Sequence, residues 1–212
     1  MICLAIPANA QRKGISVVRD AEIEALVKDY ARPLMKAGGL RRGSVRFYIV
    51  NDTSFNAFVS GRGMFINAGL LLQSETPGEA IGVIAHELGH LIGGHQARLA
   101  DRLKTAQRIA KFTTLLGIGL GAAGAATGNS DVASAGFGVV GGGQSIALRN
   151  LLSYRRGEET SADRAAVSLL KKTKQSGIGM LKTFKRLAQQ QAIRAGRVDP
   201  YMQSHPVPRD RI

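Results

Sequence analysis

The chain has 212 residues, of which 44% are hydrophobic and 21% are charged. These values exclude a disordered or fibrous protein and allow one domain with a real hydrophobic core. The net charge of +14 predicts anionic partners. The basic residues are scattered and no aromatic residues alternate with them, which disfavours nucleic acid and favours a membrane surface. The single cysteine, Cys3, excludes a framework of intrachain disulfides.

The first ten residues are interpreted as the remnant of a signal peptide. An apolar stretch at 2–6 precedes Ala8-Asn9-Ala10, which matches the A-x-A pattern of a signal-peptidase site. The apolar stretch is short and no basic residue precedes it, so the alternative is an apolar leader without a targeting role. This interpretation predicts one domain over residues 11–212 and a periplasmic location.

The first half of the chain combines a helix with short strands. Helical spacing of apolar residues predicts a helix from Asp20 to Lys36, with Asp20 as its cap. Alternation predicts a strand over 45–50. Extended stretches at 57–59 and 64–67, joined by the turn Ser60-Gly61-Arg62-Gly63, predict a β-hairpin.

A long helix follows from Thr76 to about Gly93. Thr76 can cap it, Pro77 suits the first helical position, and Glu79 completes the pattern of a capping box. Further helices are predicted over 159–172 and 177–193. Helices therefore outnumber strands, and the expected fold class is α+β, mainly helical with a small sheet.

Residues 112–128 and 132–148 form two apolar stretches rich in glycine and alanine. Each is slightly short for a membrane span and is diluted by glycine. Two interpretations remain open: a closely packed helical hairpin, or a hairpin that touches a membrane.

The segment His86-Glu87-Leu88-Gly89-His90 carries the clearest chemical signal. Histidines at positions i and i+4 of a helix project from one face, so both imidazoles can reach one zinc ion. Glu87 is rotated away from that face and can take a proton from the water that attacks a peptide carbonyl. The pattern predicts a metallopeptidase with one Zn²⁺ per chain, held by His86 and His90.

A catalytic zinc site needs a third protein ligand. Glu159 and Asp163 are spaced i and i+4, so Glu159 can bind the metal while Asp163 accepts the N–H of a ligand histidine. Glu158 is the alternative if the register differs by one residue. His95 is a second alternative, but a continuing helix would turn it away from His90, so we expect it at the surface.

These segments together resemble the gluzincin proteases of metallopeptidase family 48, which include HtpX-like and OMA-like members and periplasmic relatives with tetratricopeptide repeats. The resemblance rests on HExxH, on Glu159-Thr-Ser-Ala-Asp163, on Asn56-Ala57-Phe58 with the hairpin that follows, and on His205-Pro206. It covers about residues 20–212. The periplasmic relatives usually continue into repeats, so the chain is interpreted as truncated or as a minimal catalytic domain.

The resemblance implies a zincin-like fold in which the strand carrying Asn56, Ala57 and Phe58 forms an edge over the active site and binds substrate as an added strand. It also implies that His205 lies over the zinc, where it either closes the site or stabilises the transition state. The expected function is an endopeptidase for misfolded or stalled envelope proteins. The alternative is a chaperone-like binding module whose zinc site is occluded by its own residues. Polypeptides are the expected partners, with membrane-surface or outer-membrane assembly contacts in addition.

Overall fold

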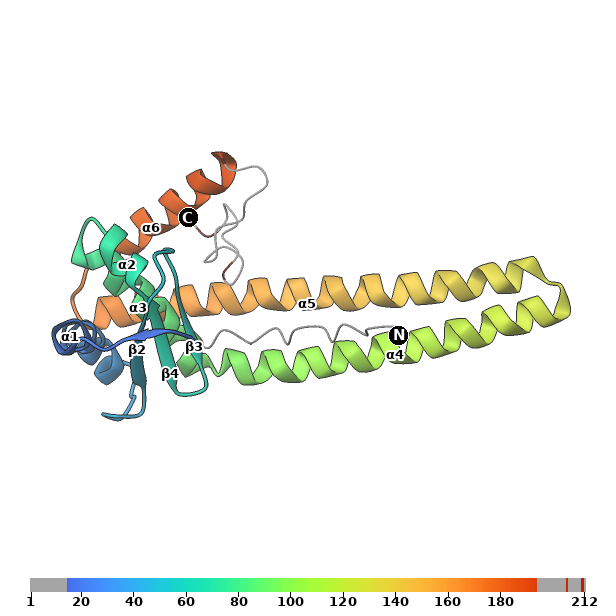
Figure 1. Cartoon of the computed structure of the whole chain (residues 1–212), viewed down its shortest axis with the longest axis horizontal. Helices are drawn as coiled ribbons and strands as arrows, with labels where there is room; N and C mark the ends of the chain where they lie inside the picture. Colours follow the sequence, from blue (N-terminus) through green and yellow to red (C-terminus); the bar gives the residue numbers. More distant parts are fainter. Residues whose placement is uncertain (1–14, 194–204, 206–210, 212) are drawn as a thin grey trace, which may run out of the picture.

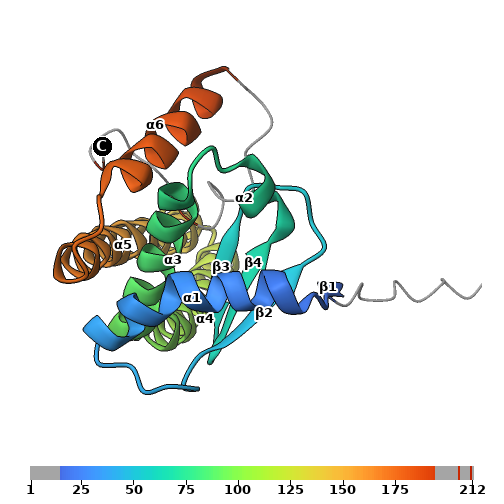
Figure 2. The same cartoon turned by 90° about the vertical axis from the view of Figure 1, so that its left-hand side faces the viewer.

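The computed structural model describes residues 15–193 together with His205 and Arg211. Figures 1 and 2 show a compact part made of a small sheet and several helices, from which a long helical hairpin projects. The α+β class is therefore confirmed, with helix as the main component. The predicted signal remnant at 1–10 lies outside the described residues and stays a prediction.

The sheet has four strands in the order β1-β2-β4-β3. They are β1 (Val17–Val18), β2 (Arg46–Val50), β3 (Ala57–Ser60) and β4 (Gly63–Asn67). β2 and β4 pair in parallel, whereas β3 and β4 form the predicted antiparallel hairpin around Gly61, whose φ is 57°. β3 is thus an edge strand, and it packs beside α3 (Pro77–Gly93).

Helices α1 and α3 begin where the sequence predicts. In α1 (Ala21–Ala37) the carboxylate of Asp20 accepts hydrogen bonds from the backbone N–H groups of Glu22 and Ile23, both at 2.9 Å. In α3, Pro77 occupies the first turn. The hydroxyl of Thr76 bonds the side chain of Glu79 at 3.4 Å rather than a backbone N–H, so the predicted capping box forms only in part.

Helix α3 runs through the centre of the compact part. Its buried side chains include Ile84 and Leu88, which are fully enclosed. It packs against α1, β3, α5 (Ser130–Lys172) and α6 (Ile178–Ile193), while the short α2 (Ala68–Gln73) lies next to β4. Its middle part is therefore buried, and the polar side chains of His86, Glu87 and His90 are at most 7% exposed.

The long hairpin consists of α4 (His95–Thr127) and α5. α4 is separated from α3 by Gly94, whose φ of 65° lies in the left-handed region that glycine adopts without strain. The predicted hairpin at 112–148 is present, but the helix predicted over 159–172 is the last part of the 43-residue α5 rather than a separate element. No proline interrupts residues 130–172, and Gly157 is tolerated within the helix.

Helices α3 and α5 approach each other backbone to backbone at Gly89. A Cβ atom built on Gly89 would lie 2.6 Å from the carbonyl oxygen and 3.0 Å from the Cα of Ala162. Only glycine permits this approach, because any side chain would push the two helices apart.

Replacing Gly89 by alanine is therefore expected to lower the free energy of unfolding by about 1–3 kcal/mol, as overpacking of a rigid contact does. Denaturant unfolding followed by circular dichroism measures this. Gly157→Ala is the control, because nothing lies within 4 Å of a Cβ at that position on α5, the helix that carries Ala162. The control should be neutral or stabilising by up to about 1 kcal/mol, and an equal loss in both variants would contradict the close approach.

Candidate metal centre

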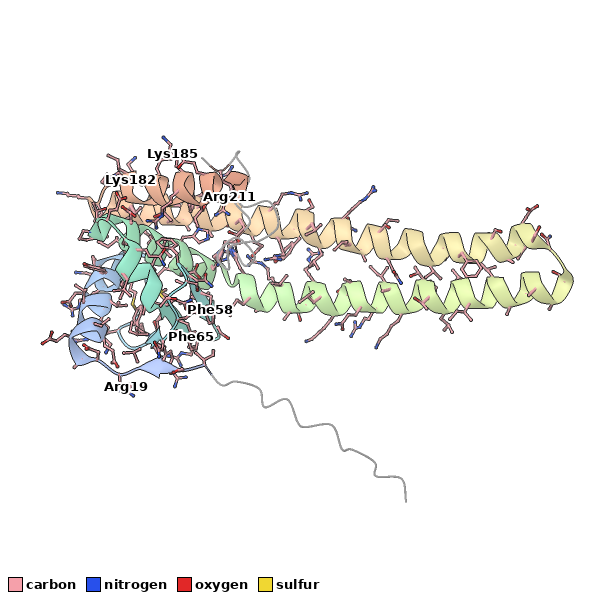
Figure 3. All side chains as sticks on the ribbon, turned by 45° about the horizontal axis from the view of Figure 1, so that its top comes forward. Arg19, Phe58, Phe65, Lys182, Lys185 and Arg211 are labelled. Atoms are coloured by element: carbon pink, nitrogen blue, oxygen red, sulfur yellow. The ribbon has the colours of Figure 1, made fainter. Side chains whose placement is uncertain are left out.

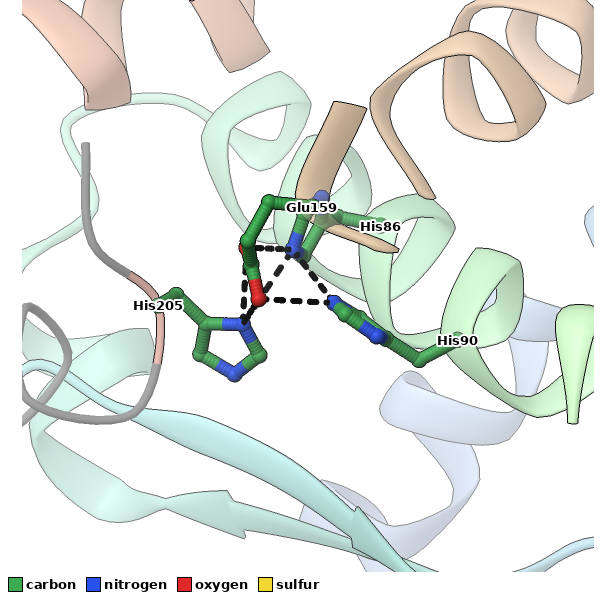
Figure 4. Close-up of side chains that lie close together, drawn as sticks. All are labelled: His86, His90, Glu159 and His205. Carbon is green, nitrogen blue, oxygen red and sulfur yellow. Dashed lines mark hydrogen bonds and ion pairs between the residues drawn. The ribbon is translucent and has the colours of Figure 1, made fainter. Parts of the chain in front are cut away.

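Four buried side chains converge at the base of the hairpin, as Figure 4 shows. His86 and His90 come from α3, one turn apart, and Glu159 comes from α5. His205 approaches from the far end of the chain. One ligand atom from each of these four residues lies within 4.8 Å of the other three.

The ring of His86 is oriented by Asp163. The Nδ1 atom of His86 lies 2.8 Å from a carboxylate oxygen of Asp163, as the i, i+4 spacing of Glu159 and Asp163 predicts. An ionised carboxylate can only accept, so His86 carries its proton on Nδ1 and presents the lone pair of Nε2 to the cluster. Arg211 completes this arrangement with bonds of 2.7 and 2.9 Å to Asp163 and a contact of 3.0 Å to Glu159.

The ring of His90 is oriented by His95, and the expectation that His95 lies at the surface is wrong. His95 is only 3% exposed, and its Nδ1 lies 2.9 Å from Nδ1 of His90. The continuing helix assumed for the prediction does not exist, because Gly94 in the left-handed conformation ends α3 before α4 begins. The pair Gly93-Gly94 was the sequence signal that could have indicated this break.

Glu158 supports His95 instead of binding the metal cluster. Its Oε2 lies 3.3 Å from Nε2 of His95, and its carboxylate accepts bonds from Arg98 at 3.1 and 3.2 Å. Burial, with the neighbouring His90, lowers the pKa of His95 to about 4, so its ring is neutral near pH 7. With its proton directed to Glu158, His95 can accept the Nδ1–H of His90, whose Nε2 lone pair then faces the cluster.

The four residues fit a tetrahedral metal ion. The Nε2 atoms of His86 and His90 are 3.0 Å apart, and the carboxylate oxygens of Glu159 lie 3.3 and 3.4 Å from them. Ligands bound at 2.0–2.1 Å in a tetrahedron are roughly 3.3 Å apart. Two facing lone pairs beside a carboxylate repel one another unless a cation lies between them. The geometry therefore matches a metal site.

The charges of the site agree with this. Burial alone would lower the pKa of His86, but Asp163 and Glu159 raise it to about 9. Burial would raise the pKa of Glu159, but its bonds with His205, His86 and His90 hold that pKa well below the usual range. Glu159 is thus an anion that stabilises positive charge on the cluster, whether as a proton or as a metal ion.

Glu87 lies beside the cluster but does not belong to it. Its side chain is fully buried, and burial raises its pKa to about 7 although His86 and His90 act in the opposite direction. One of its oxygens lies 3.2 Å from Nε2 of His205. A carboxylate with a pKa near neutrality can accept and return a proton, as a general base requires.

His205 occupies the fourth side of the cluster. Its Nδ1 lies 3.2 Å from both oxygens of Glu159 and 3.3 Å from Nε2 of His86. The adjacent Pro206 of the predicted motif lies outside the described residues. In this conformation His205 fills the place that an open catalytic site leaves for water or substrate.

A cavity of about 240 Å³ borders the cluster and is lined by Glu87, His90, Glu159, His205 and part of β3. Of the three residues predicted to bind substrate, Phe58 lines this cavity and stacks on Phe65 at 4.9 Å between ring centroids (Figure 3). The side chain of Ala57 is fully buried, so only its backbone faces the strand edge. Asn56 precedes β3, and its carbonyl accepts the N–H of Asn67 at 3.0 Å.

Comparison with known proteins identifies the family to which this chain belongs. The model of peptidase family M48 matches residues 18–212. The chain belongs to this family. The M48 peptidases are metallopeptidases, which agrees with the cluster at the base of the hairpin.

Several known proteases are similar to this chain over most of its length. The beta-barrel assembly-enhancing proteases of Yersinia pestis and of Escherichia coli strain K12 are 23% and 22% identical over 202 and 204 residues. A Vibrio cholerae relative with a similar name is 26% identical over 206 residues. In each case the match covers 95% of this chain but only 40% of the relative.

The partners of the two histidines generate a prediction. Asp163→Asn and His95→Phe are each expected to weaken metal binding by about 10–100-fold, because they remove the group that orients a ligand imidazole. Competition with a chromogenic chelator measures the affinity. Asp101→Asn, an exposed site on α4, is the control and should bind metal as the wild type does. Unchanged affinity in both variants would show that these contacts do not orient the ligands.

Proposed function

We propose that this chain is a zinc-dependent endopeptidase that cleaves misfolded or stalled proteins of the cell envelope in the periplasm. The observation that carries the proposal is that His86, His90 and Glu159 lie at the spacing of three ligands of a tetrahedral ion, next to the buried Glu87. Membership of family M48 supports peptide hydrolysis. The names of the relatives, which refer to beta-barrel assembly, support the envelope as the place of action.

In this proposal His86, His90 and Glu159 hold one zinc ion per chain, and Asp163 fixes the ring of His86. When bound, the zinc supplies a Lewis acid that polarises the scissile carbonyl. Glu87 takes the proton of the attacking water and delivers it to the departing amine, for which a pKa of about 7 is suitable. The burial of His86, Glu87 and Glu159 strengthens each of these electrostatic interactions, because little water screens them.

The free edge of β3 is proposed to hold the substrate. An extended peptide can add to this edge through the backbone groups of Ala57, because those of Asn56 and Phe58 face β4 in the antiparallel register. Asn56 and Phe58 are then proposed to flank the bound peptide, whose scissile bond is directed to the cavity next to Glu87. Binding through backbone hydrogen bonds depends little on the side chains of the substrate. It therefore suits a peptidase whose targets share an unfolded backbone rather than a common motif.

The position of His205 favours a second candidate function. Because Nδ1 of His205 closes the fourth side of the cluster, the chain could hold envelope proteins at β3 without cleaving them. This chaperone-like binding module and the peptidase differ in one respect, which is whether His205 leaves the cluster when a polypeptide binds.

Glu87→Gln is expected to reduce cleavage of casein by at least about 100-fold while about one zinc ion per chain remains bound, because the base is lost and the ligands are kept. Glu159→Ala should lose both zinc and activity. Cleavage is followed by fluorescence of labelled casein, and zinc by atomic absorption. Glu75→Gln changes an exposed glutamate and serves as the control. Undiminished cleavage by Glu87→Gln would remove the proposed mechanism.

His205→Ala separates the two candidate functions. If His205 blocks the site of a peptidase, its removal should raise the rate of casein cleavage several-fold, because the fourth position becomes open to water and substrate. If the chain is a binding module, the variant should stay inactive and should still suppress aggregation of an unfolded client. A reduced rate would instead assign His205 to stabilisation of the transition state.

A further inference from the structure

The outer part of the hairpin, residues 112–148, is almost without charge. Between Lys111 and Arg149 the only charged residue is Asp131, which lies in the first turn of α5 at the tip of the hairpin. The base of the hairpin is different, because residues 95–111 and 149–158 contain eight basic and two acidic residues. We call the uncharged part the distal hairpin and the charged part the basic collar.

The distal hairpin is packed with small residues inside and large apolar residues outside. A Cβ atom on Gly117 would lie 2.5 Å from the carbonyl oxygen of Gly136, and one on Gly124 would lie 2.3 Å from the backbone nitrogen of Ala133. The large side chains are instead exposed, with exposed fractions of 71% for Leu115 and 80% for Phe137. A hairpin in water shows the opposite arrangement, whereas helices in lipid meet through small residues.

The turn at the tip satisfies four of its backbone N–H groups internally, those of Gly128, Asn129, Asp131 and Val132. The N–H of Asn129 bonds the carbonyl of Gly124 at 2.9 Å. The side chain of Asn129 accepts the N–H groups of Asp131 and Val132 at 3.0 and 3.2 Å. A turn that enters a bilayer must meet this condition, because hydrocarbon offers no hydrogen-bond partners.

We propose that the distal hairpin inserts into an anionic phospholipid bilayer and that the basic collar rests on the headgroups. A protein partner would cover one side of the hairpin, but apolar side chains are exposed on both helices, which lipid can surround. α4 is long and apolar enough to cross a membrane. Its segment from 112 to 127 has a length of about 24 Å, somewhat less than the ~30 Å hydrocarbon core, and a bilayer thins locally around such a segment.

Insertion would fix the distance between the metal centre and the lipid. From His95 to the end of the collar at Lys111, α4 rises by about 24 Å. If the chain acts as the proposed peptidase, its substrates are polypeptides at the membrane surface that extend about 24 Å from the lipid to the metal centre. This part of the inference rests on the proposed peptidase function. Insertion itself does not depend on catalysis.

Flotation with vesicles of phosphatidylethanolamine and about a quarter phosphatidylglycerol tests insertion. The wild type should float and should remain bound in about 1 M salt, which screens the collar but not apolar contacts. The triple variant Leu115→Glu, Ile118→Glu and Phe137→Glu should stay in the soluble fraction. These side chains are 62–80% exposed, so the folded protein should be retained, as circular dichroism would verify.

The matched control places the same three charges on the compact part, at Leu72, Val167 and Ile178, which are 55–76% exposed. It should float like the wild type. Equal loss in both variants, or release of the wild type by salt, would overturn insertion in favour of surface attraction alone. Wild-type oligomers that form without lipid and dissociate in the hairpin variant would overturn it in favour of contact between copies of the chain.

A fluorescent reporter locates the contact. The chain contains no tryptophan, so Phe137→Trp provides a single probe on the distal hairpin and Leu72→Trp provides one on the compact part. Vesicles should shift the emission of the first to shorter wavelength, and brominated lipid should quench it by several-fold. The second should not respond. Identical behaviour of the two probes would contradict insertion, and because casein cleavage is measured without vesicles, either proposal can fail without the other.

Discussion

The metal centre depends on how closely α3 and α5 cross. His86 and His90 belong to one helix and Glu159 to the other, and their ligand atoms come within 3.0–3.4 Å only because the backbones touch at Gly89 and Ala162. A side chain at this crossing would move the carboxylate by more than a zinc–ligand bond tolerates. Gly89, inside the histidine motif, is therefore needed to bring the ligands of the two helices within reach of one metal ion.

The crossing also explains why polar groups accumulate around it. Two imidazoles that are to bind one metal ion through Nε2 need partners that hold the proton of the other ring nitrogen. Asp163 does this for His86, and His95 with Glu158 does it for His90. These contacts hold both imidazole rings so that their Nε2 atoms face the same metal position.

Much of this could be predicted from local sequence. The HExxH spacing and the i, i+4 pair Glu159 and Asp163 are properties of single helices, so periodicity alone indicates which side chains share a face. The position of His95 could not be obtained in this way, because a left-handed glycine changed the direction of the chain just before it. The role of Arg211 was also missed, since its contacts with Glu159 and Asp163 join residues about 50 positions apart. The unbroken length of α5 was missed because packing against α4 sustains a region with weak helical signals.

The hairpin leaves the compact part at His95 and returns at Glu159, so both of its ends contact the metal centre while its tip lies far away. Equal numbers of residues can therefore be added to or removed from α4 and α5 without moving either end. Such an insertion works as a spacer of adjustable length. Evolution could lengthen or shorten it to suit a different compartment while the chemistry at its base stays the same.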